Sequence, residues 1–192
     1  MKIVMSGTIG TGLTNLIATM IDTTEPEHPK SSLNIRAAVR DDCGLILEFI
    51  KELAEYEKLA HQVTATSEDL ENTLFSPTPS AEVIIAEWNH EPAGFALFFG
   101  NYSTFLAKPG IYLEDLYVRP EFRGNGIGTE LLKHLAALVI SRNGGRLDWW
   151  VLDWNTPSIE FYKNIGARDM NEWVPMRLQG EALIKLASHK PD

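Results

Sequence analysis

The stretch Tyr112-Leu-Glu-Asp-Leu-Tyr-Val-Arg-Pro-Glu-Phe-Arg-Gly-Asn-Gly-Ile-Gly128 decides which fold this sequence predicts. Its first part is rich in β-branched and aromatic residues, which predicts a strand over residues 111–118. The strand must end before Pro120, because proline cannot donate to a sheet ladder. Apolar residues at helical spacing then predict a helix over residues 129–140. The stretch therefore combines a strand, a short turn and the start of a helix.

The turn contains three glycines at alternate positions, Gly124, Gly126 and Gly128, directly after Arg123. Such glycines leave backbone N–H groups free to face a ligand, and the helix N-terminus adds a partial positive charge of roughly half an elementary charge. With the guanidinium of Arg123, these groups predict a pyrophosphate site, for which a simple connecting turn is the alternative. No Lys-Ser or Lys-Thr pair follows the last glycine, and the spacing is not that of a dinucleotide site, so neither of those sites is expected.

The string Arg123-Gly-Asn-Gly-Ile-Gly128 resembles the acetyl-CoA signature of the GNAT N-acetyltransferases. The string Tyr112-Leu-Glu-Asp-Leu-Tyr-Val118 is similar to the diamine and thialysine N-acetyltransferase branch, as are Trp154-Asn155 and Phe161-Tyr162-Lys163 further on. This likeness covers roughly residues 33–187. It implies an α/β fold of the GNAT type, in which helices flank a mixed central sheet whose central strands splay apart.

The resemblance implies acetyl-CoA as cosubstrate and identifies the residues that would contact it. They lie at the end of the central strand, in the glycine turn with the start of its helix, and at the beginning of a later helix: Leu116, Tyr117, Val118, Arg123, Gly124, Asn125, Gly126, Ile127, Gly128, Thr129, Asn155 and Ser158. Helix capping is the alternative role for Asn155 and Ser158. No metal is expected, because no pair among the five histidines has the spacing of metal ligands.

Acetyl transfer from a thioester to an amine needs a neutral amine, donors for the developing oxyanion and an acid for the departing thiolate. The resemblance maps Glu114 onto the acid that binds the acceptor amine and helps to remove its proton. Asp115 should face the opposite side of the strand and have a structural or indirect role. Tyr162 is the predicted acid, because a phenol with a pKa of about 10 is protonated at neutral pH. An ordinary charged strand edge and simple packing are the alternatives for Glu114 and Tyr162.

The acceptor site implied by the resemblance adds Tyr56 and Glu57, at the end of a helix over residues 45–58, and Glu172 near the C-terminus. Surface exposure alone also explains Tyr56 and Glu57. The string Trp173-Val174-Pro175 departs from the family pattern, so the register of Glu172 is open. The expected acceptor is a small cationic amine of the thialysine, diamine or polyamine type. The alternatives are an amino acid or a protein N-terminus as acceptor, and a non-catalytic acyl-CoA-binding sensor.

The composition narrows the class of protein further. A net charge of −9, with 26 acidic against 17 basic residues, argues against a nucleic-acid surface and suits either a cationic substrate or simple solubility. The single cysteine, Cys43, fits a reducing cytoplasm. No run of 18 apolar residues is present, so no membrane-spanning segment is expected. The resemblance implies a homodimer.

The whole pattern predicts the element order β-α-α-β-β-β-α-β-α-β-α. Besides the central strand and its helix, we expect strands over residues 34–39, 81–88, 93–102, 146–152 and 173–178, and helices over residues 45–58, 68–75, 156–165 and 181–187. Ser67 is the expected N-cap of the second helix. Residues 1–32 are expected to form a flexible extension or linker, or an oligomer contact, ahead of an acetyltransferase domain over residues 33–192.

Overall fold

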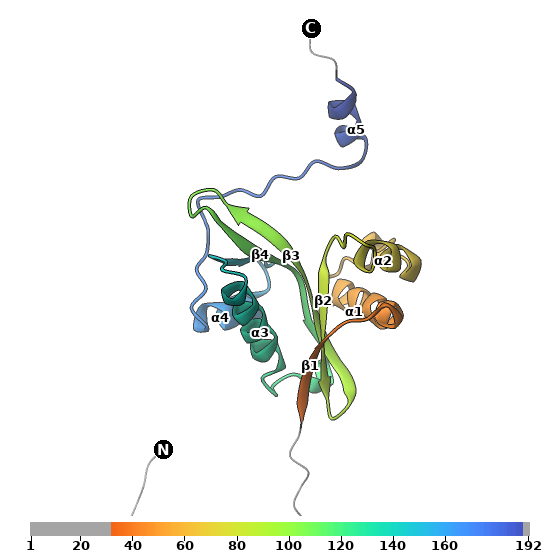
Figure 1. Ribbon diagram of the computed structural model, residues 1–192, viewed down its shortest axis with the longest axis vertical. Helices are drawn as coiled ribbons and strands as arrows, with labels where there is room; N and C mark the ends of the chain where they lie inside the picture. The colour runs from red at the N-terminus through yellow and green to blue at the C-terminus, as the bar shows by residue number, and fades with distance from the viewer. Residues whose placement is uncertain (1–31, 190–192) are drawn as a thin grey trace, which may run out of the picture.

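A five-stranded mixed sheet forms the centre of the molecule (Figure 1). The structure is a computed structural model that describes residues 32–189, so the expected N-terminal extension lies outside the described residues. The strands lie side by side in chain order: β1 (Leu33–Ala37), β2 (Glu82–Trp88), β3 (Glu91–Ser103), β4 (Lys108–Val118) and β5 (Leu147–Trp149). Neighbouring strands from β1 to β4 are antiparallel, and β5 pairs parallel to β4. The prediction of a mixed α/β sheet is confirmed.

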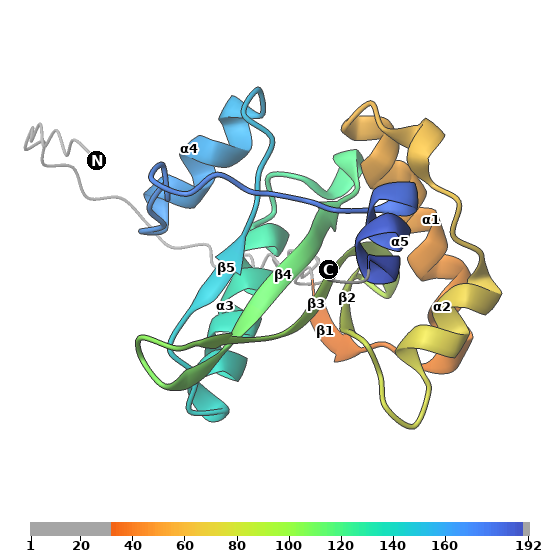
Figure 2. The ribbon, with the colours of Figure 1, turned by 90° about the horizontal axis from the view of Figure 1, so that it is seen from above.

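Helices cover both faces of the sheet (Figures 1 and 2). The elements are α1 (Cys43–Tyr56), α2 (Ser67–Leu74), α3 (Ile127–Ser141), α4 (Thr156–Asn164) and α5 (Gly180–Ser188), with short 3-10 turns at η1 (Arg40–Asp42), η2 (Ala60–Gln62) and η3 (Pro120–Phe122). The first two helices lie on one face, and α3 and α4 lie on the other. Among the described residues, no helix is long and apolar enough to cross a bilayer.

Each face of the sheet has its own apolar core. On the α1 side, Phe49 stacks on Phe95 with ring centroids 5.2 Å apart and nearly parallel planes. On the other side, Leu131 and Leu135 of α3 are fully buried in a cluster with Phe98 of β3. These side chains fall at the helical and strand spacings that the sequence predicted, so burial of the two cores sets the helix positions.

A β-bulge interrupts β4 at the position that matters most for the site. Leu97 of β3 lies opposite Asp115, while the next residue, Phe98, lies opposite Leu113, so Glu114 is the extra residue. The bulge reverses the alternation of side chains along β4. Leu113 therefore packs in the α3 core, and Tyr117, four residues later, packs in the α1 core.

The central strands part, as the resemblance implied. β4 and β5 pair at only three positions, which are Ile111 with Leu147, Tyr112 with Asp148, and Leu113 with Trp149. The expected strand over residues 146–152 is therefore shorter than predicted, because β5 loses its neighbour after Trp149. Beyond this point β4 continues to Val118, paired with β3 but, among the described residues, with no strand on its other edge.

Two local predictions are wrong. Residues 173–178 form no strand, because the segment runs outside the body of the molecule with its side chains exposed, and a strand needs a ladder partner (Figure 1). The cap of α2 is Thr66 rather than Ser67: its hydroxyl accepts a hydrogen bond from the backbone N–H of Asp69 at 3.1 Å, and the Asp69 carboxylate accepts one from the backbone N–H of Thr66.

Candidate active site

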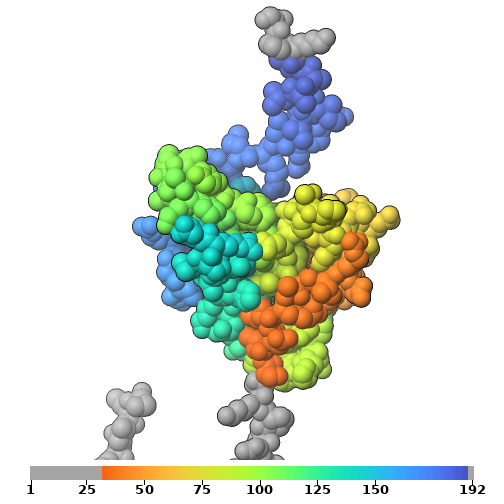
Figure 3. Space-filling model, viewed as in Figure 1, coloured from red at the N-terminus to blue at the C-terminus, as the bar shows by residue number. Residues whose placement is uncertain are grey.

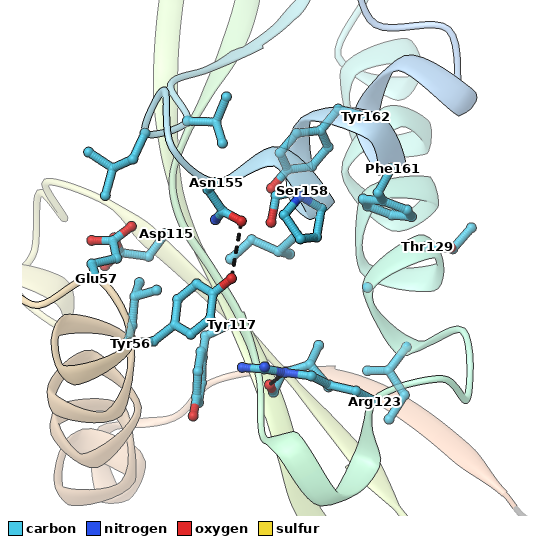
Figure 4. Close-up of a pocket in the computed structure, with 18 of the residues that line it drawn as sticks. Tyr56, Glu57, Asp115, Tyr117, Arg123, Thr129, Asn155, Ser158, Phe161 and Tyr162 are labelled. Carbon is cyan, nitrogen blue, oxygen red and sulfur yellow. Dashed lines mark hydrogen bonds between the residues drawn. The ribbon is translucent and has the colours of Figure 1, made fainter.

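The gap between the parted strands opens into a pocket of about 590 Å³ (Figure 4). Its walls are the end of α1, the second half of β4, the glycine turn with the first turn of α3, and the segment from Trp150 into α4. Segments far apart in the sequence thus meet around one cavity. A concave site of this size, with a few polar groups among apolar ones, is suited to a small-molecule ligand.

One end of the pocket is the glycine turn. Gly124 and Gly126 have φ angles of 83° and 78°, which a residue with a side chain adopts only with strain. Gly126 is the N-cap of α3, so the helix begins at Ile127, two residues earlier than predicted. The first N–H groups of a helix have no intrahelical acceptor, and the residues that carry them here, Ile127, Gly128 and Thr129, line the pocket. The turn therefore has the geometry of an anion site.

Arg123 supplies the positive charge at this end. Its Nε donates a hydrogen bond of 2.9 Å to the carbonyl of Val118. The guanidinium lies over two aromatic rings, 5.0 Å from the centroid of Tyr56 and 5.7 Å from that of Tyr117. These contacts hold the cation beside the glycine turn (Figure 4).

The predicted cofactor contacts line this pocket with one exception. Those that line it are Leu116, Tyr117, Val118, Arg123, Gly124, Gly126, Ile127, Gly128, Thr129, Asn155 and Ser158. Asn125 does not line it, because its side-chain amide turns back and donates to the carbonyl of Phe122 at 3.0 Å. That bond closes the turn.

The other end of the pocket is acidic. Glu57, Glu114 and Asp115 all line it, so the bulge lets both members of the Glu114–Asp115 pair face one cavity, contrary to the expectation from regular strand alternation. Burial, followed by the neighbouring Glu114 and Glu57 carboxylates, raises the pKa of Asp115 to about 7. Burial also raises the pKa of Glu57.

Asp115 and Glu114 differ in environment. Figure 4 shows the carboxyl groups of Asp115 and Glu57 next to each other, whereas Glu114 is exposed. Asp115 was expected to have a structural or indirect role, and no sequence signal marks the bulge that turns it into the pocket. A partly buried carboxyl with a pKa near neutral can bind or release a proton at physiological pH.

Tyr162 lies on α4 against Trp149, with ring centroids 5.0 Å apart, and points into the pocket (Figure 4). Burial raises the pKa of Tyr162 to about 12, with smaller contributions from Glu57 and Tyr56. The phenol is therefore protonated at neutral pH and available as a hydrogen-bond or proton donor.

A hydrogen bond crosses the pocket between its two sides. The hydroxyl of Tyr56, at the end of α1, donates to Oδ1 of Asn155 at 3.1 Å (dashed in Figure 4). Asn155 is the N-cap residue of α4 but makes no capping bond with its side chain, and it is 7% exposed. Its side chain thus faces the pocket rather than the helix end.

Three further findings complete the site. Glu172 does not line the pocket and lies on the exposed segment between α4 and α5. Trp150, Val151 and Leu152 do line it, although the sequence analysis assigned them to a strand; they face the cavity because β5 has ended before them.

Among residues 32–189, no group of three His, Cys, Asp or Glu side chains could hold a metal ion.

The site lies between parted strands, with the glycine turn at one end and carboxyl groups at the other. This arrangement is typical of a coenzyme-dependent transferase of the GNAT class. The chain belongs to the acetyltransferase (GNAT) family, whose sequence pattern matches residues 47–167. The protein is an N-acetyltransferase, and the family uses acetyl-CoA as cosubstrate.

Individual relatives cover most of the chain. The thialysine N-epsilon-acetyltransferase of Sus scrofa is 40% identical over 168 residues, which are 82% of this chain and 98% of that protein. The L-ornithine N5-acetyltransferase NATA1 of Arabidopsis thaliana is 31% identical over 83% of this chain and 90% of its own length. Among solved structures, an integron cassette protein from the mobile metagenome of V. cholerae matches with a TM-score of 0.70 and 32% identity, over 82% of this chain and 99% of that one.

The raised pKa of Asp115 gives a prediction for stability. Below the unfolded pKa of 3.8 the Asp115 carboxyl is protonated in both states and does not lower the stability. As the pH rises from 3.8 to about 7, the folded state progressively loses stability, and above about 7 the loss is constant. We expect Asp115→Asn to stabilise the protein increasingly with pH, by up to about 4 kcal/mol above pH 8. Urea unfolding across pH 5–8 measures this.

Asp153→Asn, at an exposed position on the neighbouring loop, is the matched control and should leave the pH dependence of stability unchanged. If Asp115→Asn raised the free energy of unfolding by the same amount at every pH, the raised pKa of Asp115 would be contradicted.

Proposed function

We propose that this enzyme transfers the acetyl group of acetyl-CoA to a primary amine of a small cationic substrate. The observation that carries the proposal is the polarity of the pocket, with a glycine turn and Arg123 at one end and the carboxyls of Glu57, Glu114 and Asp115 at the other. An anionic donor and a cationic acceptor would enter from opposite ends and meet near Tyr162. The names of the relatives, which act on thialysine and L-ornithine, support an amine of this size.

The residues at the glycine turn fit the donor. Acetyl-CoA supplies an acetyl thioester on a pyrophosphate-bearing carrier. The free N–H groups at the start of α3 and the guanidinium of Arg123 suit the pyrophosphate. An added Cβ at Gly124 or Gly126 would meet no atom within 4 Å, so the space above the turn is open to a ligand. The unpaired edge of β4 around Leu116 to Val118 offers backbone groups to the rest of the carrier.

The acidic end suits the acceptor. An ammonium must lose a proton before it can attack, and Asp115, with a pKa of about 7, is placed to accept one. Glu114, the base that the sequence predicted, stays a candidate at the exposed rim and would attract the cation together with Glu57. Tyr162 would donate a proton to the departing thiolate, because its phenol is protonated at neutral pH.

We also infer that the protein is a cytoplasmic homodimer. Helix α5 stands away from the body of the molecule, and its apolar residues Leu183, Ile184 and Leu186 are exposed (Figure 3). A helix with an apolar face is stabilised by packing that face. A second copy of the chain is the partner that the family resemblance implies, and through it Glu172 could approach an acceptor site.

The direct test of the function is an amine panel with thiol release as the readout. Thialysine, lysine, ornithine, putrescine and spermidine are each supplied with acetyl-CoA. We expect acetylation of at least one of these amines, with a kcat/KM in the range of ordinary enzymes, about 10⁴ M⁻¹s⁻¹ or higher. Thiol release with a peptide N-terminus and with none of the small amines would overturn the proposal.

Tyr162→Phe tests the acid. We expect kcat to fall about 10²-fold or more, while the dissociation constant of acetyl-CoA changes little, because the ring and its packing against Trp149 are kept. Steady-state kinetics and calorimetry measure the two quantities. Tyr102→Phe, an exposed tyrosine outside the pocket, should change neither. Equal losses of turnover and affinity in Tyr162→Phe would indicate a structural role.

Gly126→Asp tests the donor end. A carboxylate beside the proposed pyrophosphate should repel it and weaken acetyl-CoA binding about 100-fold or more. Gly166→Asp is the matched control, because Gly166 also has a positive φ, of 94°, and lies outside the pocket. Calorimetric titration with CoA gives both affinities. An unchanged CoA affinity in Gly126→Asp would contradict the proposal that the glycine turn binds the pyrophosphate.

A further inference from the structure

An arginine that the sequence analysis did not single out lies beside the acceptor end of the pocket. The guanidinium carbon of Arg177 is 5.9 Å from the ring centroid of Trp150, and Trp150 lines the pocket. The same indole meets Tyr112 edge to face, with centroids 5.9 Å apart. Arg177, from the exposed segment before α5, is thus held one side chain away from the cavity.

Arg177 differs from most other arginines of this acidic chain. Arg36, Arg119 and Arg142 each pair with a carboxylate, at 2.7 Å, 2.8 Å and 2.6 Å. Within the part of the chain that the structure describes, Arg177 makes no ion pair and no side-chain hydrogen bond. A guanidinium beside an aromatic ring keeps its five N–H donors for other partners. Its hydrogen-bonding edge is therefore available to a ligand.

Charges of opposite sign flank Tyr112 at this edge of the pocket. Burial, and then the carboxylate of Glu114, raises the pKa of Tyr112 to about 12, while Arg177 acts in the opposite direction. Both charges are therefore close enough to the phenol to influence it. The acceptor end is not uniformly negative: carboxyls lie inside, and one cation lies at the Trp150 rim.

A ligand that matches this arrangement carries a cation at one end and an anion at the other. We propose that Arg177 binds the carboxylate of an amino-acid acceptor whose side-chain amine lies against Glu57 and Asp115; this inference rests on the proposed function. A planar carboxylate accepts two parallel N–H bonds from the guanidinium fork. A plain diamine has no group for Arg177 and is repelled by it, so the residue selects amino acids over diamines of the same length.

Lys58 is the other cation near the pocket mouth. The Nζ atom of Lys58 lies 5.5 Å from the ring centroid of Trp154. Lys58 directly follows Glu57 in the chain. Lys58 is therefore adjacent in the chain to Glu57, one of the residues proposed to hold the amine. It lies near Trp154, whose ring packs against Tyr56, and not near Trp150. Neither Lys58 nor Trp154 lines the pocket, whereas Trp150, beside which Arg177 lies, does, so Arg177 is the better anchor.

The test compares acceptors that differ only in the carboxylate. L-ornithine and putrescine share one carbon chain and two amines, as do L-lysine and cadaverine, and only the amino acids carry the carboxylate. kcat/KM is measured for both pairs with wild type, Arg177→Gln and Arg177→Lys. Arg168→Gln, at an exposed arginine on the loop after α4, is the matched control for loss of one positive charge.

We expect Arg177→Gln to lower kcat/KM for the two amino acids about 10- to 100-fold, as the loss of a charge-assisted pair implies, and to leave the diamines unchanged or improved. Arg177→Lys should retain part of the preference, because it keeps the charge but not the fork. Arg168→Gln should behave as wild type.

The outcomes separate this inference from the proposed function. Wild type that acetylates none of the small amines would overturn the proposed function, and this inference with it. Wild type that prefers diamines to amino acids, or an Arg177→Gln variant that loses both kinds of acceptor alike, would overturn only the carboxylate site.

Discussion

The early end of the pairing between β4 and β5 is the constraint on which the site depends. Three paired positions are enough to fix β5 in the sheet, and the strands then part. The backbone groups of β4 beyond Leu113 are left without a strand on that side, and buried backbone groups need partners. Helices α3 and α4 lie on the same face of the sheet, and their first turns contribute to the walls of the pocket (Figure 2). A cavity at this place is thus a property of the sheet itself.

The bulge at Glu114 and the parting of the strands occur at the same level of β4. Their combination gives the pocket its polarity, because it turns Asp115 toward Glu57 while the glycine turn stays at the far end of the cavity. A desolvated carboxyl is costly for the folded protein, and such a cost is retained at functional sites. The residue that is expected to weaken the fold at high pH is therefore also the one that we propose as the proton acceptor.

Local signals allowed most of the fold and the geometry of the glycine turn to be predicted. The glycines, Arg123 and the flanking strand and helix are contiguous in sequence, so their arrangement needs no knowledge of distant partners. Asp115 could not be assigned to the pocket, because a bulge depends on the register with β3. Trp150 was wrongly placed in a strand, because local composition does not reveal that β5 stops pairing with β4 after Trp149. The wrong strand at residues 173–178 had the right composition but pairs with no strand among residues 32–189.

The hydrogen bond between Tyr56 and Asn155 has a consequence for how the enzyme is assembled. It joins residues 99 positions apart in the chain, and the cavity it crosses is walled by segments from Leu53 to Tyr162. Contacts of such long range form only after the intervening chain has been ordered, because closing a long loop costs entropy before the contact can repay it. No stretch from either half of the domain contains a complete substrate site. Catalytic competence is therefore gained at the end of folding and is among the first properties lost when α4 loosens.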